Sequence, residues 1–472
     1  MNRAAVLAIA ALLAGCDWAN ATFLNSIPLD GERTDDMYVY LAYDGLAPTT
    51  VKEAMARGAF AGGDWKSSKW ITDFPGSSDT SWSRILRAER MKGYEYAYYD
   101  PKHDQLVNAG IPGLLKHILP VFTEVLNFEP DYQRAWDYRS HGYSHNFEVY
   151  SDTWVSLGES LDDLFFQLDG HAQTSDVFIG YFMEGDVLGH TGVPEDCTRL
   201  LLRLESRIEE FKQAHPKRKF HFTIFSDHGF DYTPMPGSHF LDYGAELPKV
   251  GITVVDNLAG TQASEGVFAV PILHARLMYL AIHTRKDQVA EVGLRASQLP
   301  SVDFSVGRLG PSRYAIWSDG QLSGTFDYTN GAYGLNGDFS RFGVPAGVSS
   351  ISDEALFDLT RDGEYPDLFY RTRTALSDLA AEYPCDVLTS NKSGWQSRGW
   401  IPPPDADAML KSGAHGGAHV KGIGAILTEE RDLPTAVRAD AFLDLFPRAA
   451  QHLRDRGLKL RPTDPDADRP SR

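Results

Sequence analysis

The chain has 472 residues, a formal net charge of −19 and 43% hydrophobic residues, which is enough apolar material for a large core. This length and composition allow one large domain, or one domain that carries an insertion. The negative charge argues against nucleic acid as the main ligand, because basic side chains that neutralise phosphates dominate that affinity. A small phosphorylated substrate is compatible with it, since a local metal centre can hold such a molecule despite the overall field.

Residues 1–21 predict an export signal. Arg3 precedes an apolar run that is too short to span a membrane as a folded helix. The run ends in Leu-Ala-Gly-Cys16, which resembles the bacterial lipobox, so Cys16 would be lipidated. By the same resemblance, Asp17, which follows Cys16, favours retention of the protein at the inner membrane. The alternative is an ordinary signal cut after Ala21, and both alternatives predict an exported, periplasmic protein.

Three short apolar segments predict β-strands that each deliver an acidic residue at the carboxyl end. They are Met37–Ala42 before Asp44, Ser175–Phe182 before Glu184 and Asp186, and Lys219–Phe225 before Asp227. In an open α/β sheet, sites are built at this edge of the strands. We therefore expect the three aspartates to lie close together.

Segments with helical spacing alternate with these strands. Helices are expected at residues 81–92, 111–126, 157–168 and 198–215, and a further strand at Tyr94–Tyr98. The helix at 198–215 would join the second and third strands as a βαβ crossover. The predicted fold class is α/β, with a central, mostly parallel sheet flanked by helices.

The pattern changes in residues 231–404, which predict an inserted α+β cap. Strands are expected at Arg276–Thr284 and Arg313–Trp317, with a short helix at Lys286–Leu299 between them. The catalytic domain would then comprise residues 22–230 and 405–460, with a strand at 419–427, a helix at 436–453 and a disordered tail at 461–472. Because both ends of the insertion adjoin candidate site residues, we expect it to cover the site and to line the substrate pocket.

Two acid–imidazole pairs predict a metal centre. Asp186 and His190 are four residues apart, and Asp227 and His228 are adjacent in Phe-Ser-Asp-His-Gly229. Aspartate oxygen and histidine nitrogen suit zinc and related divalent ions. Two such pairs in one domain indicate two metal ions, and two metals indicate attack on a phosphorus centre.

The motifs and their order resemble the alkaline phosphatase superfamily, and within it the type I phosphodiesterase/nucleotide pyrophosphatase-like branch. The resemblance rests on Tyr-x-x-Glu-x-Asp-x-x-Gly-His at 181–190, Ser-Asp-His-Gly at 226–229, and Asp44-Gly45 after the first strand. It implies an alkaline phosphatase-like fold and a third histidine in a small-residue turn near the C-terminal end. His415, which Gly416 follows, fits that turn, and His419 is the alternative.

The resemblance also implies roles for these residues. One metal would take Asp186, His190 and His415, and the other would take Asp44, Asp227, His228 and a serine hydroxyl. Glu184 would orient a ligand from outside the coordination sphere. The expected cofactors are two divalent ions, Zn²⁺ above others.

The nucleophile is expected in the segment Phe74–Leu86, where the family places a Thr or Ser at the start of a helix. A register four residues before Trp82 gives Ser78, with Ser77 and Thr80 as alternatives. A hydroxyl at a helix N-terminus is favoured as an alkoxide by the helix dipole. Ser81 and Trp82 are expected to contact substrate. They stand where nucleotide pyrophosphatases carry Asn-His, and that departure puts nucleotide pyrophosphatase specificity in doubt.

The sequence therefore predicts an exported phosphohydrolase that cleaves phosphate mono- or diesters through a phosphoseryl intermediate. Alternatives are a membrane-associated phospho-group transferase, a sulfatase-like hydrolase and an inactive metal-binding lipoprotein. The sulfatase lacks support, because no Cys/Ser-x-Pro-x-Arg stands near the nucleophile. Cys197 and Cys385 can form one disulfide in an oxidising compartment or remain two buried thiols.

Overall fold

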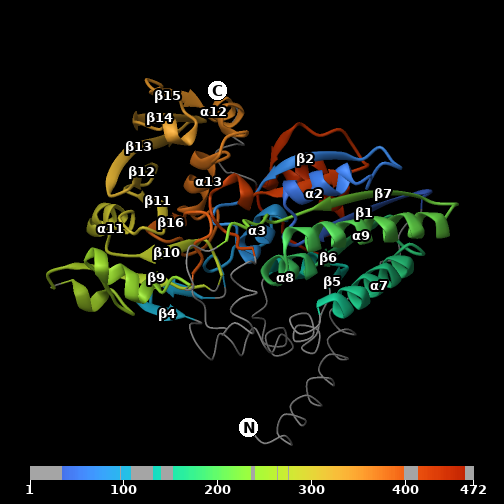
Figure 1. The fold of residues 1–472 in the computed structure, drawn as a ribbon, viewed down its shortest axis with the longest axis horizontal. Coiled ribbons are helices and arrows are strands. Elements are labelled where there is room, and N and C mark those ends of the chain that lie inside the picture. The colour runs from blue at the N-terminus through green and yellow to red at the C-terminus, as the bar shows by residue number, and fades with distance from the viewer. Residues whose placement is uncertain are drawn as a thin grey trace, which may run out of the picture.

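The structure is a computed structural model, and it describes residues 34–95, 97–107, 131–139, 153–234, 240–262, 264–274, 276–397 and 413–462. The predicted export signal with Cys16, the helix expected at 111–126 and nearly all of the expected tail lie outside these residues. Two sheets, each with its own helices, lie side by side, and the helix α3 (Ser78–Ile85) lies between them (Figure 1).

The first sheet has seven strands in the order β18-β2-β17-β7-β1-β6-β5. The strands are β1 (Asp36–Tyr43), β2 (Lys66–Ile71), β5 (Tyr138–Arg139), β6 (Val177–Phe182), β7 (Lys219–Phe225), β17 (Gly424–Thr428) and β18 (Ala436–Arg438). Strands β7, β1, β6 and β5 pair in parallel, as does β18 with β2, whereas β17 runs antiparallel to both of its neighbours. The predicted α/β class is confirmed, with a mixed rather than all-parallel sheet.

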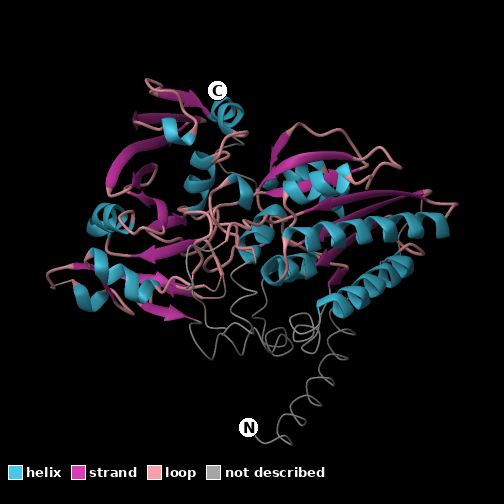
Figure 2. Cartoon of the chain, in the orientation of Figure 1, coloured by secondary structure: helices cyan, strands magenta, loops and turns pink. Residues whose placement is uncertain are grey.

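Helices cover both faces of this sheet (Figure 2). Because side chains alternate along a strand, Val39 and Leu41 of β1 enter one hydrophobic cluster while Tyr40 and Ala42 enter another. The first cluster includes residues of α2 (Pro48–Ala56), α7 (Thr153–His171) and α9 (Pro194–Ala214), and the second includes residues of α3, α15 (Phe442–Leu445) and α16 (Pro447–Asp455).

The central strands and the long helices lie close to their predicted positions, but the ends of the sheet differ. Strand β2 was not among the expected strands, and β18 replaces the start of the helix expected at 436–453. Pro447 begins a new helix there, since proline lacks the N–H that would continue the preceding one. Helix α3 begins at Ser78, three residues before the expected start.

The second sheet has nine strands in the order β15-β14-β13-β12-β11-β16-β10-β9-β8 and is antiparallel except for the β8–β9 pair. Its strands are β8 (Ile252–Val254), β9 (Val267–Ile272), β10 (Tyr279–His283), β11 (Val302–Arg308), β12 (Arg313–Ser318), β13 (Gln321–Thr329), β14 (Ala332–Gly337), β15 (Ser350–Ser352) and β16 (Val387–Asn391). The associated helices include α11 (Val289–Ala296), α12 (Asp353–Thr360) and α13 (Leu368–Ala375). The sheet is therefore much larger than the two strands expected in the insertion.

The second sheet and its associated helices form a second module. Its hydrophobic core also includes residues that precede the insertion. Tyr94 and Tyr99 pack in the same hydrophobic cluster as Val306 and Leu388. Tyr99 belongs to β3 (Tyr98–Asp100), which forms a hairpin with β4 (Gln105–Val107). The second module thus draws on two separate stretches of the chain.

Three further observations concern membrane-spanning helices, the two cysteines and the C-terminal tail. Among the described residues, no helix is both long and apolar enough to cross a membrane. Cys197 and Cys385 are buried free thiols in different hydrophobic clusters. Arg461 was expected in the tail, but its backbone N–H donates to the Arg87 carbonyl at 2.7 Å, so the packed chain extends at least to this residue.

Candidate metal centre

The six predicted ligands meet at the carboxyl ends of β6, β1 and β7. Asp44 follows β1, and Asp227 and His228 follow β7. Asp186 and His190 lie on α8 (Glu184–Thr191), which starts two residues after β6. His415 lies in the loop before β17, and its backbone forms a β-bridge with Leu277 of the second module. Parallel neighbours end at the same edge of a sheet, and this brings the distant motifs together.

The His228 imidazole lies at the middle of the cluster. Its Nε2 is 3.2 Å from Asp44 Oδ1, 3.5 Å from Asp227 Oδ2 and 3.6 Å from Asp186 Oδ1. Asp186 Oδ1 is in turn 3.4 Å from His190 Nε2 and 3.7 Å from His415 Nε2. Among the residues that the structure describes, two groups of three have the spacing of ligands, namely Asp44 with Asp227 and His228, and Asp186 with His228 and His415. The first group matches the predicted set, and in the second His228 takes the place expected for His190.

All three imidazoles are oriented by backbone carbonyls. Nδ1 of His190 donates to the Gly413 carbonyl at 3.2 Å, Nδ1 of His415 to that of Gly76 at 2.7 Å, and Nδ1 of His228 to that of Gly229 at 3.2 Å. A carbonyl oxygen only accepts, so each Nδ1 carries a proton and each Nε2 is the nitrogen that faces the carboxylates, where it can present a lone pair to a cation once it carries no proton of its own. This arrangement is typical of metal-binding histidines.

The donor atoms fit divalent ions. A tetrahedral zinc ion with ligands at 2.0–2.2 Å separates those ligands by about 3.4 Å, and the observed nitrogen–oxygen distances scatter around this value. Asp44 Oδ1, Asp186 Oδ1 and Asp227 Oδ2 are buried and accept no hydrogen bond from any described residue. Buried carboxylate oxygens that face imidazole lone pairs require positive charge between them, which metal ions supply.

The electrostatics of the cluster lead to the same conclusion. Burial, and after it the Asp44 carboxylate, raise the pKa of Asp186 to about 7. Burial and Asp44 likewise raise the pKa of Asp227 well above its usual range. Burial lowers the pKa of His228, but Asp227 and Asp44 outweigh it and bring the pKa to about 10. The site therefore binds protons strongly when it holds no other cation.

Ser78 is the candidate nucleophile whose hydroxyl faces this cluster. It is the first residue of α3, and its Oγ lies 3.4 Å from His228 Nε2. The alternatives point away: Ser77 Oγ and Thr80 Oγ1 both donate to the Tyr94 carbonyl, at 2.5 and 2.7 Å. The geometry thus separates Ser78 from its two neighbours, which the sequence alone left open.

Trp82 and Ser81 are placed differently from their expected role as substrate contacts. Both are fully buried, and the Trp82 ring packs edge-on against Trp136, Tyr181 and Phe225. Trp82 therefore fixes α3 on the sheet and has no exposed surface to offer a substrate.

Two further expectations concern residues beside the ligands. Glu184 is fully buried at the start of α8 beneath the ligands. His419, the alternative ligand, pairs with Glu364 at 2.8 Å. His415 is thus the histidine of this loop that enters the cluster.

Three residues near the centre were missed by the sequence reasoning. The Tyr181 hydroxyl donates to Asp44 Oδ2 at 2.5 Å and so orients a ligand. Arg276 of the insertion donates from Nη2 to the His190 carbonyl at 2.7 Å and has a left-handed backbone (φ 63°). The Phe230 ring contacts all three imidazoles. Tyr181 opens the recognised motif, but nothing in the sequence marks the other two.

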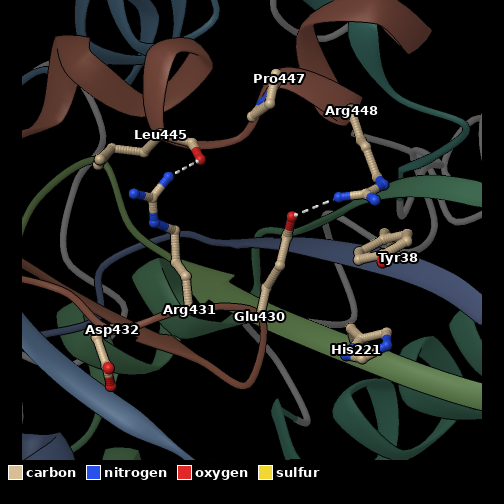
Figure 3. A pocket seen from close by; sticks show the side chains of 8 residues that line it. All are labelled: Tyr38, His221, Glu430, Arg431, Asp432, Leu445, Pro447 and Arg448. Carbon is tan, nitrogen blue, oxygen red and sulfur yellow. Dashed lines mark hydrogen bonds and ion pairs between the residues drawn. The ribbon is translucent and has the colours of Figure 1, made fainter.

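A separate cavity of about 430 Å³ lies near the opposite ends of β1 and β7 (Figure 3). Its polar groups are already partnered, because Tyr38 stacks on His221 and lies under Arg448, while Arg431 donates to the Leu445 carbonyl at 2.5 Å. Tyr38 and His221 are paired near the starts of their strands, far from the aspartates at the other ends. The cavity is therefore not part of the metal centre.

An α/β sheet with three aspartates and three imidazoles at its carboxyl edge is a candidate metal site of the kind expected for the alkaline phosphatase superfamily. The sequence model of the type I phosphodiesterase/nucleotide pyrophosphatase family matches residues 53–344, more than half of the chain. The protein belongs to this family, which supports phosphoester hydrolysis as its activity.

Comparison with solved structures gives distant matches. Murine ectonucleotide pyrophosphatase/phosphodiesterase 5 aligns with 91% of this chain and 97% of its own, at 11% identity and a TM-score of 0.44. An inactive variant of that protein in complex with AMP gives the same values, and the human protein gives 10% identity with the same coverage and TM-score. No curated relative matches the chain at a significant level. These likenesses are too distant to assign individual residues.

Proposed function

We propose that this protein is an exported, two-metal phosphoester hydrolase in which Ser78 is the nucleophile. The observation that carries the proposal is the position of Ser78 Oγ, 3.4 Å from His228 at the edge of a cluster of five side chains with ligand spacing, beside which His190 lies 3.4 Å from Asp186. Asp44, Asp227 and His228 would hold one ion beside Ser78, and Asp186, His190 and His415 would hold the second. His228 is close enough to Asp186 to lie between the two positions.

Bound divalent ions would lower the pKa of the serine hydroxyl and offset charge on the phosphoryl oxygens. Ser78 Oγ gives up its proton to solvent and attacks phosphorus in line with the leaving group, which departs as an alkoxide with the bonding electron pair and takes a proton from solvent. The resulting phosphoseryl ester is hydrolysed by water in a second step that restores the hydroxyl. Helix α3 supports Ser78 in this role, because the N–H groups of its first turn favour negative charge at that end.

The protein is expected to hold about two zinc-like ions per chain, because two groups of three ligands share one cluster. Metal analysis of the purified soluble portion after mild dialysis measures this directly. Chelation should abolish hydrolysis of bis-p-nitrophenyl phosphate, and added Zn²⁺ should restore it. A preparation that retains no transition metal and hydrolyses the diester in the presence of chelator would contradict the proposal.

Arg276 is expected to contribute to substrate binding. Beside the larger effect of burial, its positive charge acts to lower the pKa of Asp186, His190 and His415, and its side chain is only partly buried. An anionic substrate at the second metal position would meet this guanidinium. Losing a hydrogen bond to a charged group costs about 1.5–3 kcal/mol, so R276A should lower kcat/KM for the diester by roughly 10- to 100-fold. An unchanged kcat/KM, measured by steady-state kinetics, would restrict Arg276 to anchoring the His190 carbonyl.

We propose that export follows from the N-terminal signal, with a lipid on Cys16 holding the protein at the inner membrane. Expression with radiolabelled palmitate in a bacterial host tests this, with C16S as the matched control. Label in the wild-type protein that is absent from C16S supports the anchor. A protein cut after Ala21 and recovered unlabelled from the periplasm supports the ordinary signal instead.

A further inference from the structure

Phe230, two residues after His228, lies beneath the metal centre. Its ring centroid is 5.2 Å from that of His190, 5.3 Å from that of His228 and 5.4 Å from that of His415. The three ring planes are nearly perpendicular to the Phe230 ring, at 89°, 78° and 77°. Phe230 is only 3% exposed, so the ring is held by its surroundings as well as by the imidazoles.

Three glycines beside metal ligands make room for this ring. A Cβ at Gly45, next to Asp44, would come 2.4 Å from the Phe230 ring, and one at Gly189, next to His190, would come within 2.2 Å. At Gly413, two residues before His415, the separation would be 2.8 Å. No real Cβ approaches an aromatic carbon so closely, so these positions require glycine while the ring stays in place.

We propose that Phe230 is a positioning residue that sets the direction of the three imidazoles and thereby the affinity for metal; this inference rests on the proposed function. Nδ1 of each imidazole already donates a hydrogen bond to a backbone carbonyl, but the imidazole ring can still tilt about that hydrogen bond. Perpendicular contact with a rigid ring removes this freedom, and edge-to-face aromatic pairs are favourable in themselves. His228 and His415, whose planes are 2° apart at 3.7 Å, then rest side by side on one aromatic surface.

The proposal gives the glycines of the motifs a common cause. Gly189 in Gly-His190 is needed because the ring occupies the space that a side chain would take, and Gly45 in Asp44-Gly has the same ring beside it in addition to a left-handed backbone (φ 75°) that itself favours glycine. Gly229 is different, since a Cβ there would meet the Ile423 carbonyl at 2.3 Å and not the ring. The ring and the two motif glycines therefore form one packing unit around the ligands.

The test is Zn²⁺ affinity, measured by competition with a chromogenic chelator on the full chain, for wild type, F230L and F230A. Changes in groups that orient metal ligands typically cost on the order of 10- to 100-fold in affinity, and we expect a loss of this size in F230A. F222A is the matched control, because Phe222 is a fully buried phenylalanine of β7, the strand before Phe230, and its ring contacts Phe220 and Lys212 and none of the imidazoles. In the metal-free state, the midpoint temperature of thermal unfolding should be lower than that of the wild type for both F222A and F230A.

A double-mutant cycle tests the glycine argument. G189A should weaken Zn²⁺ binding, and G189A/F230L should bind better than G189A alone, because the smaller side chain leaves room for the methyl group. Gly170 in α7 is the control glycine, since a Cβ there meets nothing within 4 Å. The inference is overturned if F230A binds Zn²⁺ as tightly as F222A. If F230A does not fold, the same comparison is made with F230L. A wild-type protein that binds no Zn²⁺ would instead remove the proposed function.

Discussion

Replacing Ser78 with alanine is expected to abolish turnover while the fold and the metal ions remain. Ser78 Oγ is the hydroxyl of this segment that faces the cluster, at 3.4 Å from His228, and loss of a nucleophile typically costs several orders of magnitude in kcat. Steady-state hydrolysis of bis-p-nitrophenyl phosphate measures the loss. Metal analysis and circular dichroism on the same preparation show whether the site and the fold survive.

Two variants of the same helix make this result specific. Thr80→Ala removes a hydroxyl that donates to the Tyr94 carbonyl, and Ser83→Ala removes one that donates to the Glu89 carbonyl. Both should lower stability by about 1 kcal/mol through a lost hydrogen bond and leave kcat near the wild-type value. An active Ser78→Ala protein beside an inactive Thr80→Ala protein would move the nucleophile by two residues.

The centre of the fold was predictable because its physical signals are local. Strands β1, β6 and β7 are short apolar runs, and each one delivers an aspartate just beyond its end. Parallel pairing then places Asp44, Asp186 and Asp227 at one edge without further information. The same argument could not find β2 and β18, because β2 is mixed in polarity and the edge strand β18 has only three residues.

The finer details of the site depend on tertiary contacts that no local pattern encodes. Phe230 and Arg276 carry no motif, and only the folded chain brings them to the imidazoles. Trp82 shows the reverse case: it occupies a motif position, yet its indole is buried against the sheet. Ser78 was separable from Ser77 and Thr80 only once the partners of all three hydroxyls were visible.

The insertion was expected to cover the site, and its contacts reach into the loops that carry the candidate ligands. The Met278 N–H donates to the His415 carbonyl at 2.8 Å, and Arg276 donates to the carbonyl of His190. The insertion therefore supports two metal ligands through their backbone, and deleting it would remove that support. Selection of substrates by its aromatic residues stays a prediction.

Arg371 of α13 is expected to be the residue of the insertion whose loss has the largest effect. Its guanidinium is 2% exposed and donates to the carbonyls of Ala418 at 2.7 Å, Asp73 at 3.0 Å and Pro366 at 3.3 Å. Asp73 begins the loop to Ser78, and Ala418 closes the turn that contains His415. R371L would leave these buried carbonyls without a donor, at a cost of about 3 kcal/mol or more in the free energy of unfolding. Denaturant unfolding of the metal-free protein measures this cost.

The matched control is Arg308→Leu, because Arg308 also donates to three carbonyls, those of Gly310, Leu376 and Pro311, within the second module. Both variants should be destabilised, but only R371L should lose activity in the folded fraction. The reason is that the Gly76 carbonyl accepts from His415 Nδ1, so a shift between the two loops moves Ser78 and a ligand together. A displacement of about 1 Å can cost on the order of 100-fold in rate, which kcat per folded molecule would report. Equal kcat values in the two variants would mean that Arg371 stabilises the protein without aligning its site.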